Sequence, residues 1–215
     1  ENTNWADLGH EIAWEQFKLP YTCPVADQPG IPVGFASIKV DETPEAVAVN
    51  GDGFALVFEK SSGKIKQFTY QGSELLASGL ELNIWRAATD NDGFKFADEI
   101  DWLEHKLLNQ WIKHGINRLE ATCDALTWEQ SDGVVVVKTA HTVKADGAEY
   151  GFRHQTTYTV YPSGDVQTDH EVECDSMLPL LPRMGVLLTL PAGFEQFTWL
   201  GRGPEESYAD RKAGV

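Results

Sequence analysis

The regular spacing of turn dipeptides in the second half of the chain most constrains its fold. Asp132-Gly133, Asp146-Gly147 and Ser163-Gly164 separate segments rich in β-branched and aromatic residues. Such dipeptides suit tight β-hairpin turns, because glycine accepts the positive φ that these turns require. Strands joined by successive hairpins are antiparallel, and each pairs with its neighbour in sequence. The pattern predicts a meander with strands over residues 119–129, 134–143, 150–161 and 166–174.

In the first half, turns also separate short apolar segments. Gly51-Asp52-Gly53 and Ser61-Ser62-Gly63 interrupt apolar segments, and Phe54, Leu56 and Phe58 alternate with other residues. Strands separated by turns every 8–12 residues or so are typical of a sandwich or barrel. We therefore predict an all-β fold, an antiparallel β-sandwich. Three further expectations are strands over 184–190 and 194–200, and burial of both faces of the apolar run 134–137.

One helix is expected to interrupt the strands. Asp98 is a suitable N-cap and Gly115 a suitable residue just beyond the C-terminus. Apolar residues recur on one predicted face at helical spacing. They are Ile100, Leu103, Leu107 and Trp111.

Proline and glycine mark a boundary near the N-terminus. Residues 20–34 contain Pro20, Pro24, Pro29, Gly30, Pro32 and Gly34. This density excludes the interior of a strand or helix, so the segment is predicted to be a linker. Residues 1–19 are expected to form a strand, and residues 35–215 the sandwich.

Charge and cysteine content exclude several classes of function. The chain has 17 basic and 33 acidic residues, a net charge of −16. Nucleic acids and anionic membranes require clustered positive charge, so neither is expected as a partner. Cys23, Cys123 and Cys174 lie far apart, which is neither metal-ligand spacing nor a disulfide framework. The cellular compartment, cytoplasm or periplasm, stays undecided.

The stretch from Leu82 to Phe96 joins a predicted strand to a polar turn. Leu82 and Ile84 alternate with Asn83 and Trp85, and Thr89-Asp90-Asn91-Asp92-Gly93 follows. Short polar side chains and a glycine favour a tight, ordered turn. Arg86 is placed to bind the carboxylate of Asp90 or Asp92. The turn is interpreted either as a structural corner or as a loop that reaches a ligand pocket.

Three motifs carry a resemblance to a known family. Trp85-Arg86-Ala87-Ala88-Thr89-Asp90-Asn91-Asp92 resembles the Arg-Ala-Pro-x-Asp-Asn-Asp signature in the last domain of large bacterial β-galactosidases of glycoside hydrolase family 2. The segment from Gly201 to Arg211 is similar to that domain's Gly-x-Gly-Pro-x-Glu-Asn-Tyr-x-Asp-Arg, and the segment from Trp5 to Gln16 resembles the strand that closes the preceding immunoglobulin-like domain. Three residues depart from the family pattern: Ala88, Gly93 and Ser207.

The resemblance implies a galactose mutarotase-like sandwich within a fragment of a retaining β-galactosidase. Residues 1–19 would then be the last strand of the immunoglobulin-like domain. In that family both catalytic glutamates lie in a central barrel domain, and no segment here matches their motifs, so this chain alone is expected to be inactive. The implied partners are the remaining domains of the parent enzyme and further copies of it, with galactoside bound only by the full enzyme. No cofactor is expected in this chain, whereas the parent enzyme is a candidate for Mg²⁺ and Na⁺.

The resemblance also assigns site residues. The expected pocket-rim loop consists of Asp92, Gly93, Phe94, Lys95 and Phe96. The other motif residues are expected to be structural. They are Arg86, Asp90, Asn91, Gly201, Gly203, Pro204, Glu206, Tyr208, Asp210 and Arg211.

Two alternatives remain open from the residues. A self-sufficient carbohydrate-binding module would use exposed tryptophans as stacking platforms, with Trp85, Trp102, Trp128 and Trp199 as candidates. An aldose epimerase would need a general acid and a general base, for which His154 and His170 on adjacent predicted strands, with Glu171, are candidates. The carboxylate pairs Glu205-Glu206 and Glu171/Glu173 are interpreted as solvated surface.

Overall fold

The computed structural model describes residues 3–10, 17, 20–21, 37–93 and 105–198. The chain divides into two units, one formed by Glu1–Gln28 with Phe194–Val215 and the other by Pro29–Gly193. The helices and strands described below all lie in the second unit.

Two strands expected near the ends of the chain are not formed where the structure describes them. Residues 3–10, within the expected strand 1–19, form bends and a turn in which the His10 N–H donates to the Asp7 carbonyl at 3.1 Å. Gly9 takes a φ of 93° there, which a strand does not accommodate. Residues 194–198, part of the expected strand 194–200, are also not a strand. Periodicity yields a strand only where a neighbouring strand is available for pairing.

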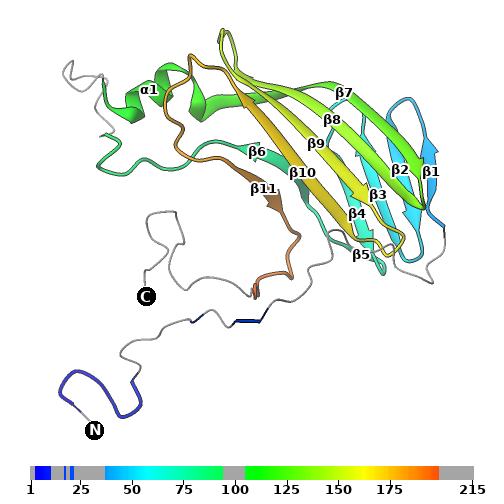
Figure 1. Ribbon diagram of the computed structural model, residues 1–215, viewed down its shortest axis with the longest axis horizontal. Coiled ribbons are helices and arrows are strands. Elements are labelled where there is room, and N and C mark those ends of the chain that lie inside the picture. Colours follow the sequence, from blue (N-terminus) through cyan, green and yellow to red (C-terminus); the bar gives the residue numbers. More distant parts are fainter. Residues whose placement is uncertain (1–2, 11–16, 18–19, 22–36, 94–104, 199–215) are drawn as a thin grey trace. The chain divides into compact units, whose positions relative to one another are not determined.

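The first sheet is built from five consecutive antiparallel strands. Its order is β1-β2-β3-β4-β5, which places each strand beside its sequence neighbours (Figure 1). Phe54, Leu56 and Phe58 are all buried on one face of β3, as their alternation predicts. The bounds are β1 Lys39–Glu42, β2 Ala46–Gly51, β3 Phe54–Glu59, β4 Ile65–Tyr70 and β5 Ser73–Glu74.

The second sheet is the predicted meander, with order β10-β9-β8-β7. Asp132 and Gly133 have φ of 51° and 79°, so this dipeptide forms the expected primed turn between β7 and β8. The expected burial of both faces at 134–137 is wrong: Val135 and Val137 are fully buried, whereas Val134 and Val136 are half-buried. The bounds are β7 Leu119–Ser131, β8 Val134–Ala145, β9 Phe152–Val160 and β10 Val166–Cys174.

A short third sheet joins distant parts of the chain. β6 (Ser78–Asn83) pairs antiparallel with β11 (Gly185–Thr189), which lies within the strand expected over 184–190. β6 ends at Asn83, whose side-chain oxygen accepts the Trp85 N–H at 3.1 Å. The strand therefore stops before Ile84 and Trp85, which the alternation pattern had included.

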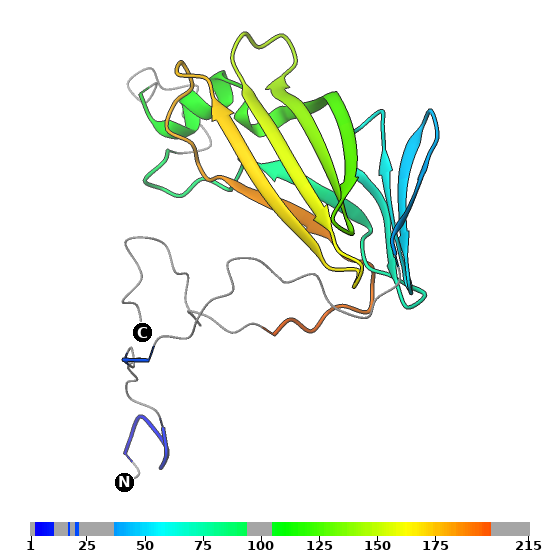
Figure 2. The ribbon, with the colours of Figure 1, turned by 45° about the vertical axis from the view of Figure 1, so that its right-hand side comes forward.

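The two larger sheets form separate layers with a shared apolar core (Figure 2). Leu56 and Phe58 from the first layer and Val137, Tyr158 and Val160 from the second belong to one buried cluster. The Phe58 and Tyr158 rings meet edge to face, with centroids 5.0 Å apart. The all-β class and the antiparallel sandwich predicted from the sequence are thus confirmed.

The helix is shorter than its sequence pattern predicts. α1 spans Leu107–Lys113 and begins after Lys106, so Asp98 is not its N-cap; Asp98 itself lies outside the described residues. Its C-terminal end agrees with the prediction, because Gly115 follows with a φ of 71°. A short 3₁₀ helix, Ile116–Arg118, leads into β7. In the described part of the chain, no helix is both long and apolar enough to cross a lipid bilayer.

A second apolar cluster fixes α1 to the ends of β8 and β9. Trp111 and Leu108 of α1 are buried there together with Ile84, Val143 and Phe152. Trp111 is 1% exposed and so packs in the core, as its place on the apolar face predicts.

We predict that Gly115→Ala destabilises the chain by more than Gly147→Ala. Both glycines have a positive φ, 71° and 69°, so both substitutions strain the backbone. An added Cβ at Gly115 would lie 2.4 Å from the Ala145 Cβ, whereas at Gly147 nothing lies within 4 Å. We expect Gly147→Ala to lower the free energy of unfolding by about 1 kcal/mol and Gly115→Ala by about 3 kcal/mol, measured by urea denaturation. Equal losses would contradict the packing of the helix end against β8.

Candidate functional site

The chain turns sharply after β6, at the polar stretch that the sequence singles out. Ile84, 2% exposed, anchors the segment in the second apolar cluster. The N–H groups of Asp92 and Gly93 both donate to the Thr89 carbonyl, at 3.0 and 3.3 Å. Residues 89–93 therefore form the ordered turn that the sequence predicts.

Arg86 binds Asp92, not Asp90. Its two terminal nitrogens donate to the two carboxylate oxygens of Asp92 at 2.6 and 3.1 Å. The Asp92 Oδ2 also accepts the N–H and the hydroxyl of Thr89, at 2.8 and 2.9 Å. Asp92 is 6% exposed, whereas Asp90 and Asn91 are exposed to solvent. The two-point geometry is the arrangement a planar guanidinium favours, and it fixes the direction of the turn.

These hydrogen bonds determine the charge state of Asp92. The bond from Arg86 is the largest influence, and with the Thr89 donors it outweighs burial and lowers the pKa of Asp92 to about 2. The carboxyl group is therefore ionised at neutral pH, with its oxygens occupied by donors from the chain itself.

The same arginine joins the turn to two other segments. Its Nε donates to the Pro182 carbonyl at 2.8 Å, and its guanidinium carbon lies 5.2 Å from the centroid of the Trp111 ring on α1. The Trp111 indole N–H donates to the Leu180 carbonyl at 2.7 Å, and the Trp85 ring meets Trp111 edge to face at 6.1 Å. We call Arg86, Asp92 and Trp111 the corner cluster.

Gly93 lies where the corner meets the helix. The Leu108 N–H donates to the Asp92 carbonyl at 2.9 Å, which satisfies one of the free donors of the first turn of α1. A Cβ on Gly93 would lie 3.2 Å from the Leu108 Cβ and 3.3 Å from the Lys106 Cβ, and the glycine has a φ of 138°. The backbone on either side of residues 94–104 is thus held together at Asp92 and Leu108.

The other site residues divide into those the structure describes and those it does not. Asp90 and Asn91 are exposed on the turn. Phe94, Lys95 and Phe96 of the expected rim loop lie outside the described residues. So do all the C-terminal motif residues, Gly201, Gly203, Pro204, Glu206, Tyr208, Asp210 and Arg211.

The arrangement of the candidate residues does not favour either alternative, the carbohydrate-binding module or the aldose epimerase. Trp85 packs against the second apolar cluster, and Trp128 is half-buried and donates to Glu42 at 2.9 Å. Both rings are thus partly covered by the chain itself; Trp102 and Trp199 lie outside the described residues. His154 and His170 do meet, but Glu171 is exposed and pairs in register with Gln155, on the opposite face of the sheet.

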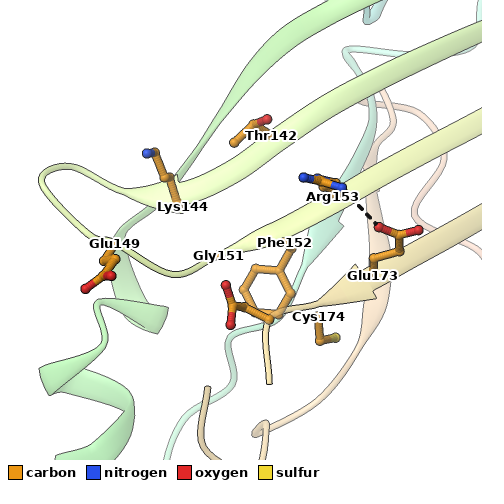
Figure 3. A pocket seen from close by; sticks show the side chains of 9 residues that line it. Thr142, Lys144, Glu149, Gly151, Phe152, Arg153, Glu173 and Cys174 are labelled. Carbon is orange, nitrogen blue, oxygen red and sulfur yellow. Dashed lines mark ion pairs between the residues drawn. The ribbon is translucent and has the colours of Figure 1, made fainter. Parts of the chain in front are cut away.

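Sequence reasoning missed a hollow at the ends of β8, β9 and β10 (Figure 3). It has a volume of 380 Å³ and mixed charge, with Lys144 and Arg153 near Glu149, Glu173 and Asp175. Arg153 and Glu173 form an ion pair at 3.7 Å, and Glu173 is exposed, as expected for a surface carboxylate. Residues on three strands and a loop meet here only through strand register, so no local sequence signal indicates the hollow.

We predict that Asp92→Asn lowers the free energy of unfolding by about 2 kcal/mol at pH 7, since it removes the charge that Arg86 binds. The pKa of Asp92 is lowered from 3.8 to about 2, so its stabilisation is complete above pH 3.8 and is lost as pH falls through 2. The difference between the two chains in urea denaturation should therefore shrink from pH 4 to pH 2. Asp90→Asn, at the exposed neighbour, is the control and should change little; a loss as large as that of Asp92→Asn would contradict the assignment.

Comparison with known proteins identifies a family and several relatives. Residues 50–215 match the family model described as the β-galactosidase small chain. A β-galactosidase of Priestia megaterium is 32% identical over 216 residues, which cover 100% of this chain and 19% of that protein. A β-galactosidase of Psychromonas ingrahamii is 33% identical over 213 residues, covering 96% of this chain and 20% of that protein.

The similarity extends to a yeast. A β-galactosidase of Kluyveromyces lactis is 28% identical over 211 residues, covering 95% of this chain and 19% of that protein. The chain thus spans about a fifth of the length of the relatives it matches. Since the family model matches most of the sequence and the fold is the expected all-β sandwich, this chain belongs to the β-galactosidase small-chain family.

Proposed function

We propose that this chain is a non-catalytic part of a β-galactosidase that hydrolyses terminal β-D-galactosides with retention. Its relatives are named β-galactosidases and are about five times as long as the matched segment, which supports the presence of the catalytic carboxylates elsewhere in the enzyme. Retaining hydrolysis requires two carboxyl groups about 5–5.5 Å apart, one as nucleophile and one as acid and base. The role assigned here is to support that site.

The corner cluster carries this proposal. Arg86 and Asp92 hold the turn, and the Leu108 N–H holds the Asp92 carbonyl, so the chain leaves the corner at Gly93 in a fixed direction. We assign Asp92, Gly93, Phe94, Lys95 and Phe96 to the rim of the galactoside pocket. The two-point ion pair would then position the rim loop without contacting the sugar, since donors of this chain already occupy the Asp92 oxygens.

The proposed partners are the remaining domains of the enzyme. Residues 1–19 are assigned to a preceding immunoglobulin-like domain, residues 20–34 to a linker and residues 35–215 to the sandwich. Side chains on β11 and beside it leave apolar surface exposed: Leu180 is 76%, Met184 50% and Leu187 54% exposed. Such a patch supports packing against further protein, from the same enzyme or from another copy of it. Any Mg²⁺ or Na⁺ that the enzyme uses is assigned to its other domains.

We predict that Gly93→Ala in the whole enzyme changes kcat and KM together. The new Cβ would press on Leu108 and Lys106 at a backbone φ of 138°, and so would redirect the start of the rim loop. Hydrolysis of a nitrophenyl galactoside measures both constants. Gly72→Ala is the matched control, because Gly72 has a φ of 79° with nothing within 4 Å of the added Cβ. Kinetic constants unchanged by Gly93→Ala, or changed equally by the control, would contradict the positioning role.

The non-catalytic assignment has a separate test in the isolated chain. Calorimetric titration with galactose and lactose, beside the nitrophenyl galactoside assay, should show neither binding nor turnover. Binding without turnover would identify a self-sufficient carbohydrate-binding module instead. Turnover by a pure preparation would overturn the assignment of catalysis to the rest of the enzyme.

A further inference from the structure

A polar layer divides the interior of the sandwich. The inner face of the second sheet carries His141 on β8, His154 on β9 and His170 on β10. The centroids of adjacent rings lie 6.2 Å apart for His141 and His154, and 5.2 Å apart for His154 and His170. His141 is 8% and His154 5% exposed, with apolar clusters on either side along the strands. We call these three residues the histidine row.

The contacts between His154 and His170 do not allow both rings to be charged. The His154 Nε2 and the His170 Nδ1 lie 3.0 Å apart, and a hydrogen bond between them needs a proton on one nitrogen and a lone pair on the other. The Thr156 hydroxyl lies 3.2 Å from each of these two nitrogens, within hydrogen-bonding distance of both. If both rings were charged, two N–H donors would face each other and the bond would be lost.

The surroundings of His141 also favour a neutral ring. Its Nε2 lies 2.8 Å from the Ser62 carbonyl, which can only accept, so this nitrogen carries the proton. Its Nδ1 is buried and has no partner among the described residues. Protonation of Nδ1 would therefore create a buried donor without an acceptor, in addition to a buried charge.

The charged groups around the row do not neutralise an added proton. A hollow of 280 Å³ exposes His141 and His154 to Lys64, Glu81 and Glu120 on its walls. Lys64 and Glu81 bind each other at 2.8 Å, and Glu120 is exposed. Among the described residues, the other titratable neighbours are the Cys123 thiol, opposite His141 on β7, the Tyr158 hydroxyl, and Asp169, which adjoins His170 in sequence. Burial raises the pKa of both Cys123 and Tyr158, so neither supplies negative charge near neutral pH.

Burial, then the charges of the other two rings, lower the pKa of His154 from 6.5 to about 4. Burial also lowers the pKa of His170, against the opposing charge of Asp169.

A metal site does not explain the row, because its rings are stacked and tilted side by side. Moreover, in the part of the chain that the structure describes, no three His, Cys, Asp or Glu side chains are grouped to hold a metal ion.

We infer that the histidine row makes the packing of the two sandwich layers sensitive to acid: a proton is taken up by the row more readily once the layers have separated, so mildly acidic pH favours their separation. The sign follows from the lowered pKa of His154. Its contribution to stability is complete above pH 6.5, the ordinary value, and is lost as pH falls through 6.5 towards 4. In that window the unfolded chain binds a proton that the folded chain does not, so the unfolding equilibrium constant rises roughly tenfold per pH unit for that ring.

The test is urea denaturation of the chain at pH 7.5 and pH 5.0, followed by tryptophan fluorescence. His154 alone should raise the unfolding equilibrium constant by roughly thirtyfold between these pH values. His154→Gln with His170→Asn replaces both rings by neutral amides that retain a nitrogen or oxygen near the Nε2 and Nδ1 positions. In this double variant the pH effect should fall by at least tenfold. His105→Gln, at an exposed histidine, should leave the pH effect unchanged.

An equal pH effect in the double variant and the unsubstituted chain would overturn the inference. If the double variant does not fold at pH 7.5, an NMR titration of the unsubstituted chain measures instead the pH at which its imidazole rings become protonated. A His154 ring that remains neutral in the folded chain down to pH 5 would support the inference. A His154 ring that titrates near pH 6.5 while the chain stays folded would overturn it.

Discussion

Burial of the inner faces of the two larger sheets is the constraint on which the rest of this structure depends. Val135, Val137 and Val160 are fully buried against Leu56 and Phe58 of the opposite layer. Each apolar side chain removed from water contributes about 1.5–3 kcal/mol, so this cluster fixes the register of the strands that carry it. A shift of one residue would turn these side chains to solvent and the half-buried ones inward.

That register has consequences away from the core. It aligns His141 with His154 and brings His170 beside His154, so the row lies inside the sandwich. It also brings the ends of β8 and β9 to α1, where Val143 and Phe152 help to bury Trp111. Trp111 in turn lies beneath the Arg86 guanidinium and donates to the Leu180 carbonyl. The corner cluster therefore rests on the same packing as the sheets, and a change in the core would reach Asp92 through Trp111.

The sequence predicted those parts of the fold that depend on local pattern. Turn dipeptides and alternation placed the strands of the second sheet to within two residues at every end, because a hairpin needs only adjacent segments. Helical spacing alone extended α1 too far towards its N-terminus. Its first turn is instead set by the Asp92 carbonyl, which accepts from Leu108. The run 134–137 looked fully buried because apolarity does not reveal whether a second layer covers a strand's outer face.

The sequence by itself determined the all-β class, the order of the hairpin-linked strands in the second sheet, and that Arg86 would bind a carboxylate of the turn. Each follows from residues close together in the chain. Only the tertiary structure decided that the carboxylate is Asp92 rather than Asp90. Arg86 also donates to Pro182, 96 residues further along the chain, and that contact together with Trp111 fixes where the guanidinium points. The histidine row is decided in the same way, since three rings far apart in sequence become neighbours only when the strands pair.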